Sequence, residues 1–231
     1  MSLCWVVTGA NRGIGLEFAK QLIARGDRVI ATVRDAKRAG ALRDMAQAAA
    51  GTLEIFACDT ASDSGVESFC RAVGERAVDV LINNAGVIGS MTSLEELDFA
   101  DITHTFDVNA LGPLRVTRGL LGALERSATR RVVSISSGMG SIADNANGGA
   151  YGYRLSKAAL NMANRSMSVD LRERGFTCVV LNPGWVQTDM GGSQAPLPVD
   201  RSVRSMLDLI DRLTPQDNGR FLNVTGNDFP W

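Results

Sequence analysis

Short apolar runs alternate along the chain with stretches in which apolar residues recur every three or four positions. A run that is apolar almost throughout is typical of a strand that is buried on both faces of a parallel sheet. Runs of this kind predict seven strands, at Leu3–Thr8, Arg28–Val33, Leu53–Ala57, Val78–Ile82, Arg131–Ile135, Thr177–Leu181 and Phe221–Val224.

The stretches between these runs have the apolar spacing of amphipathic helices. The first carries apolar residues at Ile14, Phe18 and Leu22 and stops before Gly26, a residue type that commonly ends a helix. Ser62 is a candidate N-cap for a helix of about 12 residues. The predicted helices are Gly13–Arg25, Ala36–Ala50, the helix after Ser62, a long helix from Phe99 to Glu125 that is interrupted at Gly112-Pro113, Tyr151–Arg174 and Val199–Leu213.

Buried strands that are separated by helices indicate an α/β fold, with a doubly wound parallel sheet of seven strands and helices on both faces. The length of 231 residues is typical of one domain, so we expect a single domain over residues 1–231. Two irregular stretches, Gly138–Gly149 and Gly184–Pro198, follow strand ends. Ligands of such sheets bind beyond the carboxyl ends of the strands, and we expect the site there.

The composition argues against several classes of protein. The net charge is −1 and the Lys and Arg residues are scattered, which argues against nucleic acid and acidic membranes as partners. The N-terminus lacks the apolar core of a signal peptide, and no apolar run is long enough to cross a membrane. Cys4, Cys58, Cys70 and Cys178 form no C-x-x-C pair and lack metal-ligand spacing. We therefore expect reduced thiols, no metal and a cytoplasmic location.

A glycine-rich turn joins the first predicted strand to the first predicted helix. Gly9, Gly13 and Gly15 give the spacing G-x-x-x-G-x-G. Glycine allows a pyrophosphate to approach the backbone closely, and the helix N-terminus supplies free N–H groups. A tight loop without a ligand is the alternative, but the place of the turn between strand and helix favours a bound dinucleotide.

Arginine residues near this turn bear on the choice of cofactor. Arg34 follows the second strand, where an acidic residue would bind a ribose 2′-hydroxyl and an arginine a 2′-phosphate. Arg12 lies within the glycine turn. Two guanidinium groups suit a phosphate, so we predict NADP(H) as the cofactor. In the alternative, Arg34 is solvated and Asp35 binds the ribose.

Tyr153 and Lys157 are four positions apart and therefore lie on one face of a predicted helix. A buried ammonium favours phenolate over phenol, so we expect the lysine to lower the pKa of the tyrosine. Such a tyrosine can donate or accept a proton near neutral pH. Most pairs with this spacing are ordinary neighbours on a helix surface, and the other motifs make this one a candidate catalytic pair.

The motifs, in this order, resemble those of the short-chain dehydrogenase/reductase family over nearly the whole chain. The matching residues are Gly9, Asn11, Arg12, Gly13, Ile14 and Gly15 of the cofactor turn, Asp59 and Thr60 after the third strand, Asn84, Ala85 and Gly86 after the fourth, Asn109, Ser137, Tyr153, Lys157, and Pro183, Gly184, Val186 and Thr188 of a PGxVxT loop. The resemblance implies a Rossmann fold that binds NADP(H) through these segments.

By this resemblance, Ser137 hydrogen-bonds the substrate carbonyl and Tyr153 protonates the developing alkoxide. Lys157 binds the nicotinamide ribose as well as lowering the tyrosine pKa, and Asn109 supports a water that feeds protons through Lys157. Taken singly, Ser137 could be a turn cap, Asn109 a cap at the helix interruption and Lys157 a solvated side chain.

Two further roles are implied for the cofactor site. Asp59 contacts the adenine, and the hydroxyl of Thr188 binds the nicotinamide carboxamide. Thr188 could instead cap a short loop helix.

Ser137 and Tyr153 lie 16 positions apart, a wider spacing than is common in the family. The extra residues lie in Ala143–Gly149, and the chain ends in Phe229-Pro230-Trp231. These features are similar to a subgroup that includes sniffer-type carbonyl reductases and bacterial C-factor proteins. The resemblance implies NADPH-dependent reduction of a ketone or aldehyde to an alcohol; the alternative is a C-factor-like signalling protein with incidental turnover.

The substrate pocket and the assembly are less defined by the sequence. Candidate pocket walls are Met139, Trp185 and Met190, with Ile142, although core positions would suit the same residue types. We expect a small-molecule substrate, and a homodimer or homotetramer paired through the helices that begin near Phe99 and Tyr151.

The end of the chain carries large apolar side chains. We expect Phe229 and Trp231 to pack near the Gly184–Pro198 loop or across a subunit contact, and the alternative is a disordered tail.

Overall fold

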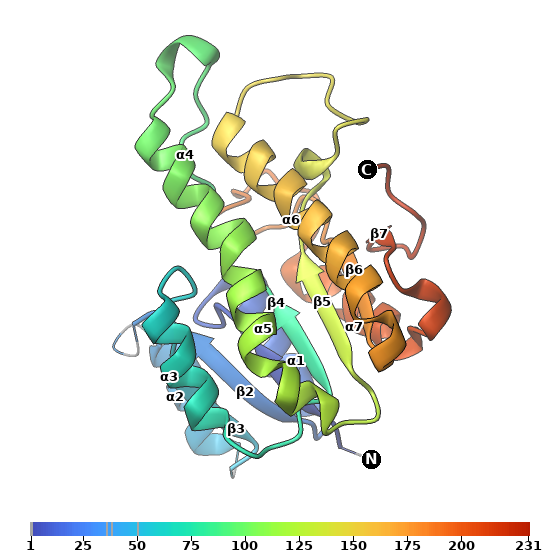
Figure 1. Ribbon diagram of the computed structural model, residues 1–231. Helices are drawn as coiled ribbons and strands as arrows, with labels where there is room; N and C mark the ends of the chain where they lie inside the picture. Colours follow the sequence, from blue (N-terminus) through green and yellow to red (C-terminus); the bar gives the residue numbers. More distant parts are fainter. Residues whose placement is uncertain (1, 36, 38, 50) are drawn as a thin grey trace.

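Seven parallel strands form one sheet, in the order β3-β2-β1-β4-β5-β6-β7, and helices cover both of its faces (Figure 1). The computed structural model of the protein describes residues 2–35, 37, 39–49 and 51–231. The predicted doubly wound α/β fold with seven strands is confirmed.

Each strand lies close to its predicted position. The strands are β1 (Cys4–Val7), β2 (Arg28–Val33), β3 (Leu53–Ala57), β4 (Val80–Asn83), β5 (Arg131–Ile135), β6 (Thr177–Asn182) and β7 (Phe221–Asn223). The largest shift is at β4, which begins at Val80 rather than Val78. The reason is that the N–H of Val78 bonds to the carbonyl of Ala123, at 3.0 Å, and not to a neighbouring strand.

The helices also follow the predicted pattern. They are α1 (Gly13–Ala24), α2 (Gly40–Ala48), α3 (Asp63–Val73), α4 (Phe99–Phe106), α5 (Gly112–Glu125), α6 (Tyr151–Asp170) and α7 (Val199–Arg212). The Ser62 hydroxyl accepts the N–H of Gly65 at 3.1 Å, which confirms Ser62 as the N-cap of α3. The ends of the predicted helix Ala36–Ala50 lie outside the described residues, and α6 ends before the separate 3₁₀ turn Arg172–Arg174.

Alternate strand residues point to opposite faces of the sheet and build two cores. On one face, Trp5 of β1 packs in a cluster with Phe18 of α1 and with residues of α2 and α7. On the other face, Val6 packs in a cluster with Phe69 of α3 and with residues of α5 and α6. The sheet is therefore buried on both sides, which leaves its carboxyl edge for the site.

The predicted interruption of the long helix takes an unexpected form. A π-helical turn, η3 (Asp107–Leu111), joins α4 directly to α5, and Pro113 lies in the first turn of α5. Proline is tolerated there because its missing N–H is not needed. The helix therefore widens without breaking, and Asn109 lies in the widened turn.

The tail of the chain is docked, as predicted, but the contacts that hold it lie at β7 and at the segment after β5 and not at the predicted loop of residues 184–198. The rings of Phe229 and Trp231 lie 5.1 and 5.4 Å from the ring of Phe221. The carbonyl of Trp231 accepts hydrogen bonds from the N–H of Ala143, at 2.9 Å, and the hydroxyl of Ser141, at 3.1 Å. In Figure 1 the red tail accordingly runs beside the yellow segment 138–149.

The cysteines are free thiols. Cys4, Cys58 and Cys178 are buried, and Cys70 is half-buried. Burial raises the pKa of Cys58 and of Cys178 to about 12, so both stay protonated at neutral pH. Within the part of the chain that the structure describes, no helix has the length and apolar character that crossing a membrane requires.

Deleting residues 228–231 should lower the melting temperature by about 2–8 °C, because half-buried Phe229 and Trp231, which is 43% exposed, together contribute roughly 1–2 kcal/mol of apolar burial. Thermal unfolding followed by circular dichroism measures this change. Leu94→Ala is the control: its side chain is 61% exposed and lies outside α4 and α6, and its loss should leave the melting temperature nearly unchanged. Identical melting of the truncated and full chains would show that the tail contributes nothing.

Candidate active site

The glycine turn between β1 and α1 is packed against the segment that follows β4. Gly9 has a φ of +66°, and a Cβ there would lie 2.8 Å from the Cα of Ala85. A Cβ on Gly15 would lie 2.4 Å from the carbonyl oxygen of Gly9. The hydroxyl of Thr8 accepts the N–H groups of Asn84, at 2.9 Å, and Ala85, at 3.0 Å. Only glycine allows the backbone to come this close at Gly9 and Gly15. The glycine turn and the segment after β4, both predicted to bind the cofactor, therefore form one packed unit.

The N-terminus of α1 is free to bind an anion. Arg12 stands at the N-cap position without a capping side-chain bond, and the first turn contains no acidic residue. The exposed N–H groups and the helix dipole favour a negative group. Thr188 borders the turn, since a Cβ on Gly13 would lie 3.4 Å from its methyl carbon. The cradle therefore fits the pyrophosphate of a dinucleotide.

The two predicted 2′-phosphate ligands have different surroundings. Arg12 forms an ion pair with Asp189 at 3.2 Å, and both side chains are largely exposed. Exposed pairs of this kind are weak, so Arg12 can exchange partners. The carboxylate of Asp35 accepts the N–H of Lys37 at 2.9 Å, whereas the exposed side chain of Arg34 is available beside it.

Asp59 and Thr60 follow β3 on the same edge of the sheet. The Asp59 carboxylate accepts the N–H of Ala61 at 3.1 Å and is exposed. Thr60 is buried, and its hydroxyl would lie 3.0 Å from a Cβ on Gly112. The structure thus holds Asp59 at the surface, where it can reach a ligand, and Thr60 against the start of α5.

The predicted catalytic residues converge at the carboxyl ends of β4 and β5. Ser137 is the second residue after β5 and caps the short turn η4 (Gly138–Gly140) by accepting the N–H of Met139 at 3.1 Å. Its hydroxyl is also close enough to Tyr153 to lower the pKa of the phenol. Lys157 donates to the carbonyl of Ile135 at 2.9 Å, and its nitrogen lies 5.7 Å from the centre of the Tyr153 ring.

Asn109 ties the segment after β4 to α6. Its amide accepts the N–H of Val87 and donates to the carbonyl of Val87, both at 2.8 Å, and it donates to the hydroxyl of Ser156 at 3.0 Å. A Cβ on Gly86 would lie 3.1 Å from the Asn109 oxygen and 3.7 Å from the Lys157 nitrogen. Asn109 therefore does not serve as a cap at the interruption; the π turn aims it into the site, as π turns often do.

The electrostatics of the pair differ from the prediction. Burial lowers the pKa of Lys157 to about 8. Burial also raises the pKa of Tyr153, and the hydrogen bond from Ser137 opposes that rise only in part. The predicted lowering of the tyrosine pKa is therefore wrong for this structure. Loss of solvation raises the pKa of Tyr153, and the Lys157 ammonium does not offset this rise because it bonds to the carbonyl of Ile135 and not to the phenol.

The loop of residues 184–198 is compact. The hydroxyl of Thr188 accepts the N–H of Gly191 at 3.0 Å, so it caps a turn and not the short loop helix of the alternative explanation. Pro183 accepts the hydroxyl of Ser202 at 2.7 Å, and Val186 is buried. Gly184 has a φ of +80°.

The candidate pocket walls lie outside the core. Met139, in η4 beside Ser137, is half-buried, whereas Trp185, Met190 and Ile142 are 59%, 40% and 80% exposed. Apolar side chains on the two loops that follow β5 and β6 are thus available to a ligand. The only histidine, His104, is exposed on α4.

Two residues that the sequence motifs did not predict, Thr8 and Asn161, hold the site together through their hydrogen bonds. Thr8 joins the two cofactor segments, and Asn161, on α6, joins the turn after β5 to the helix. Asn161 is one helical turn beyond Lys157, and that spacing is the signal that could have found it.

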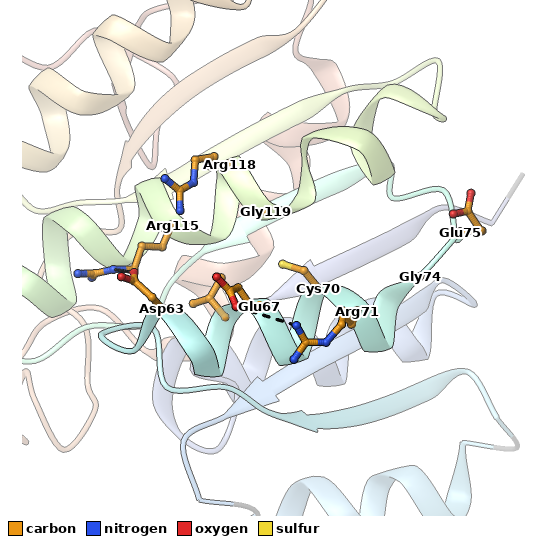
Figure 2. A pocket seen from close by; sticks show the side chains of 10 residues that line it. Asp63, Glu67, Cys70, Arg71, Gly74, Glu75, Arg115, Arg118 and Gly119 are labelled. Atoms are coloured by element: carbon orange, nitrogen blue, oxygen red, sulfur yellow. Dashed lines mark hydrogen bonds and ion pairs between the residues drawn. The ribbon is translucent and has the colours of Figure 1, made fainter.

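A separate cavity of about 440 Å³ lies between α3 and α5 (Figure 2). Its charges are largely paired: Arg115 bonds to Asp63 and to Asp107, each at 2.7 Å, and Arg71 lies 4.0 Å from Glu67. None of its lining residues belongs to the predicted site. Across the described ranges of the chain, no three His, Cys, Asp or Glu residues gather as metal ligands.

Known proteins share both the sequence and the fold. Residues 4–196 match the family model described as short chain dehydrogenase. The chain is 56% identical to C-signal of Myxococcus xanthus over 166 residues, which cover 72% of this chain and 100% of that protein. The NADPH-bound carbonyl reductase from chicken fatty liver is similar over 100% of both chains, with 35% identity and a TM-score of 0.94. Carbonyl reductase Sniffer of D. melanogaster is similar over 100% of both chains, with 31% identity and a TM-score of 0.95.

The low pKa of Lys157 predicts a pH-dependent stability. The folded pKa of about 8 lies below the ordinary lysine value of 10.5, so between these values the unfolded chain holds a proton that the folded chain has released. The contribution of Lys157 to stability therefore rises with pH across this window, by on the order of 1–3 kcal/mol. Lys157→Met should remove the rise. Urea unfolding of both proteins at pH 7.5 and pH 9.5 measures it, and parallel pH profiles would contradict the assignment.

Proposed function

The chain belongs to the short chain dehydrogenase family, and on that premise we propose that it reduces the carbonyl group of a ketone or aldehyde to an alcohol with NADPH. One observation carries the proposal: Asn109, Ser137, Tyr153 and Lys157 converge beside a glycine cradle that suits a dinucleotide. A protein that only binds a nucleotide has no need of this set. The resemblance to carbonyl reductases supports the choice of substrate class.

When bound, the nicotinamide supplies a hydride to the carbonyl carbon. The residues of this chain manage the oxygen. The hydroxyls of Ser137 and Tyr153 hydrogen-bond the substrate oxygen, and Tyr153 transfers its proton to the oxygen as the hydride reaches the carbon. Donors that are already in place where negative charge appears lower the barrier.

Lys157 stabilises the tyrosinate that is left after proton transfer. Its nitrogen is held near the Tyr153 ring by the bond to Ile135, and its pKa of about 8 lets a protonated fraction persist at neutral pH. Asn109 holds the neighbouring backbone in place and supports the water that returns the proton through Lys157. Because its pKa is raised, Tyr153 stays protonated and acts as a proton donor and not as a base when the charge of the Lys157 ammonium is absent.

We propose NADP(H) and not NAD(H) as the preferred cofactor. The exposed Arg34 follows β2, Arg12 forms an exposed ion pair with Asp189, and the carboxylate of Asp35 accepts the N–H of Lys37. Asp59 would contact the adenine, and Thr188 the carboxamide after giving up its turn contact.

Assembly and location are also proposals. Leu155, Met162 and Val169 are seven positions apart on α6 and more than half exposed, and Phe99 on α4 is 73% exposed. This apolar surface supports a homodimer or homotetramer paired through these helices. A single domain, a cytoplasmic location and a small-molecule substrate, without nucleic acid or membrane partners, complete the proposal.

A second function is favoured by the identity with C-signal, namely a signalling protein whose turnover is incidental. A panel of aldehydes, ketones and quinones, read by loss of NADPH absorbance, separates the two. Efficient turnover of at least one compound supports the reductase. Cofactor binding without turnover of any of them supports the signalling role.

Tyr153→Phe should lower the rate of carbonyl reduction by about 10²–10⁴-fold, because the proton donor is lost. The dissociation constant for NADPH should change little. Tyr151→Phe is the matched control, since Tyr151 lies on the same helix two positions away and should keep most of the rate. A more severe loss in Tyr151→Phe would show that the proton donor is misassigned.

Arg34→Asp should weaken NADPH binding by about 10–100-fold, because a charge-assisted contact of roughly 1.5–3 kcal/mol is lost and a repulsion is added. Binding of NADH should be unchanged or improved. Fluorescence titration of both cofactors measures the preference. Equal affinities of the unmodified protein for the two cofactors would end this part of the proposal.

A further inference from the structure

The turn that carries Ser137 is fastened to α6 by one buried amide. The oxygen of Asn161 accepts the hydroxyl of Ser136 at 2.6 Å, and its nitrogen donates to the carbonyl of Gly140 at 3.2 Å. Ser136 directly precedes Ser137, and Gly140 ends η4, so both ends of the turn bond to the same side chain. Asn161 is only 3% exposed.

The same turn touches the backbone of α6. A Cβ on Gly140 would lie 2.8 Å from the Cβ of Lys157 and 2.9 Å from its carbonyl carbon. The turn therefore rests directly on the helix, one helical turn before Asn161. Tyr153, Lys157 and Asn161 follow one another at intervals of four and share one face of α6.

These contacts connect two parts of the site that come from different elements. Ser137 belongs to the segment after β5, whereas Tyr153 belongs to α6, and the Ser137 hydroxyl is close enough to Tyr153 to lower the pKa of the phenol. The reaction needs both hydroxyls on one substrate oxygen. An error of about 1 Å in such a placement can cost 10²-fold in rate.

We propose that Asn161 is a positioning residue, which holds the turn of Ser137 against α6 and so sets the place of the Ser137 hydroxyl relative to Tyr153. This inference rests on the proposed reductase function for its effect on rate. The effect of Asn161 on the position of Ser137 relative to Tyr153 can be measured even if the protein has no turnover, because both side chains are present in the free protein.

Asn164 provides a matched control on the same helix. It is fully buried, and its amide nitrogen makes two hydrogen bonds, to the hydroxyl of Ser134 at 3.0 Å and the carbonyl of Val179 at 3.1 Å. Both partners lie in strands, away from η4. Asn161→Ala and Asn164→Ala therefore remove comparable buried contacts, and only the first should affect Ser137.

The kinetic test is a double-mutant cycle. Asn161→Ala should lower kcat by about 10–100-fold, with NADPH affinity unchanged, whereas Asn164→Ala should lower the melting temperature and largely keep kcat. Ser137→Ala alone should lower kcat by about 10²-fold. If Asn161 acts through Ser137, adding Asn161→Ala to Ser137→Ala causes little further loss. Losses that multiply would overturn the proposal.

The second test needs no turnover. The chain has two tyrosines, so Tyr151→Phe leaves Tyr153 as the only one, and 3-fluorotyrosine then gives a single ¹⁹F resonance at position 153. Ser137→Ala calibrates the shift caused by losing the contact with Ser137. Asn161→Ala should move the resonance in the same direction, and Asn164→Ala should leave it in place. An unmoved resonance in Asn161→Ala would overturn the proposal.

The two tests separate the possible failures. An unmodified protein that turns over no carbonyl compound contradicts the proposed function, and the ¹⁹F measurement still decides whether Asn161 positions Ser137. If Asn161→Ala does not fold, Ser136→Ala replaces it, because it removes the 2.6 Å bond and leaves the asparagine in place. Ser136→Ala should then show the same shift and the same non-additivity with Ser137→Ala.

Discussion

The burial of Lys157 is the constraint on which the rest of the site depends. The lysine is 5% exposed, and its nitrogen donates to the carbonyl of Ile135 at the end of β5. Two glycine residues leave room for the Lys157 side chain. A Cβ on Gly86 would lie 3.7 Å from the lysine nitrogen, and a Cβ on Gly140 would lie 2.8 Å from the lysine Cβ. A buried amine loses solvation, and the fall of its pKa to about 8 is the consequence.

Around this lysine, several buried polar side chains form hydrogen bonds that connect the two halves of the site. Asn109 joins Val87 to Ser156, Asn161 joins the ends of the Ser137 turn to α6, and Thr8 joins the glycine turn to Asn84. A buried group without a partner is costly, so these contacts specify one arrangement. The nucleotide cradle and the proton donor thereby share one rigid edge of the parallel sheet.

The fold could be predicted from the sequence because apolar runs and helical periodicity depend on local burial alone. The strands, the capped α3 and the free glycine turn all follow from such local signals. Other features depend on tertiary contacts: the π turn at Asn109 requires the neighbouring backbone at Val87, and the high pKa of Tyr153 requires its burial. The docking of the tail at Ser141 and Ala143 and the role of Asn161 likewise arise between segments far apart in the chain.

The central claim is that the site transfers a hydride to a carbonyl carbon, and isotope transfer tests it most directly. The protein would be incubated with carbonyl compounds and with NADPH that carries deuterium at C4 of the nicotinamide, in each of the two stereochemical forms. The account predicts an alcohol with deuterium on the carbinol carbon from one form and unlabelled alcohol from the other. Oxidation of NADPH without deuterium in any product, from either form, would contradict it.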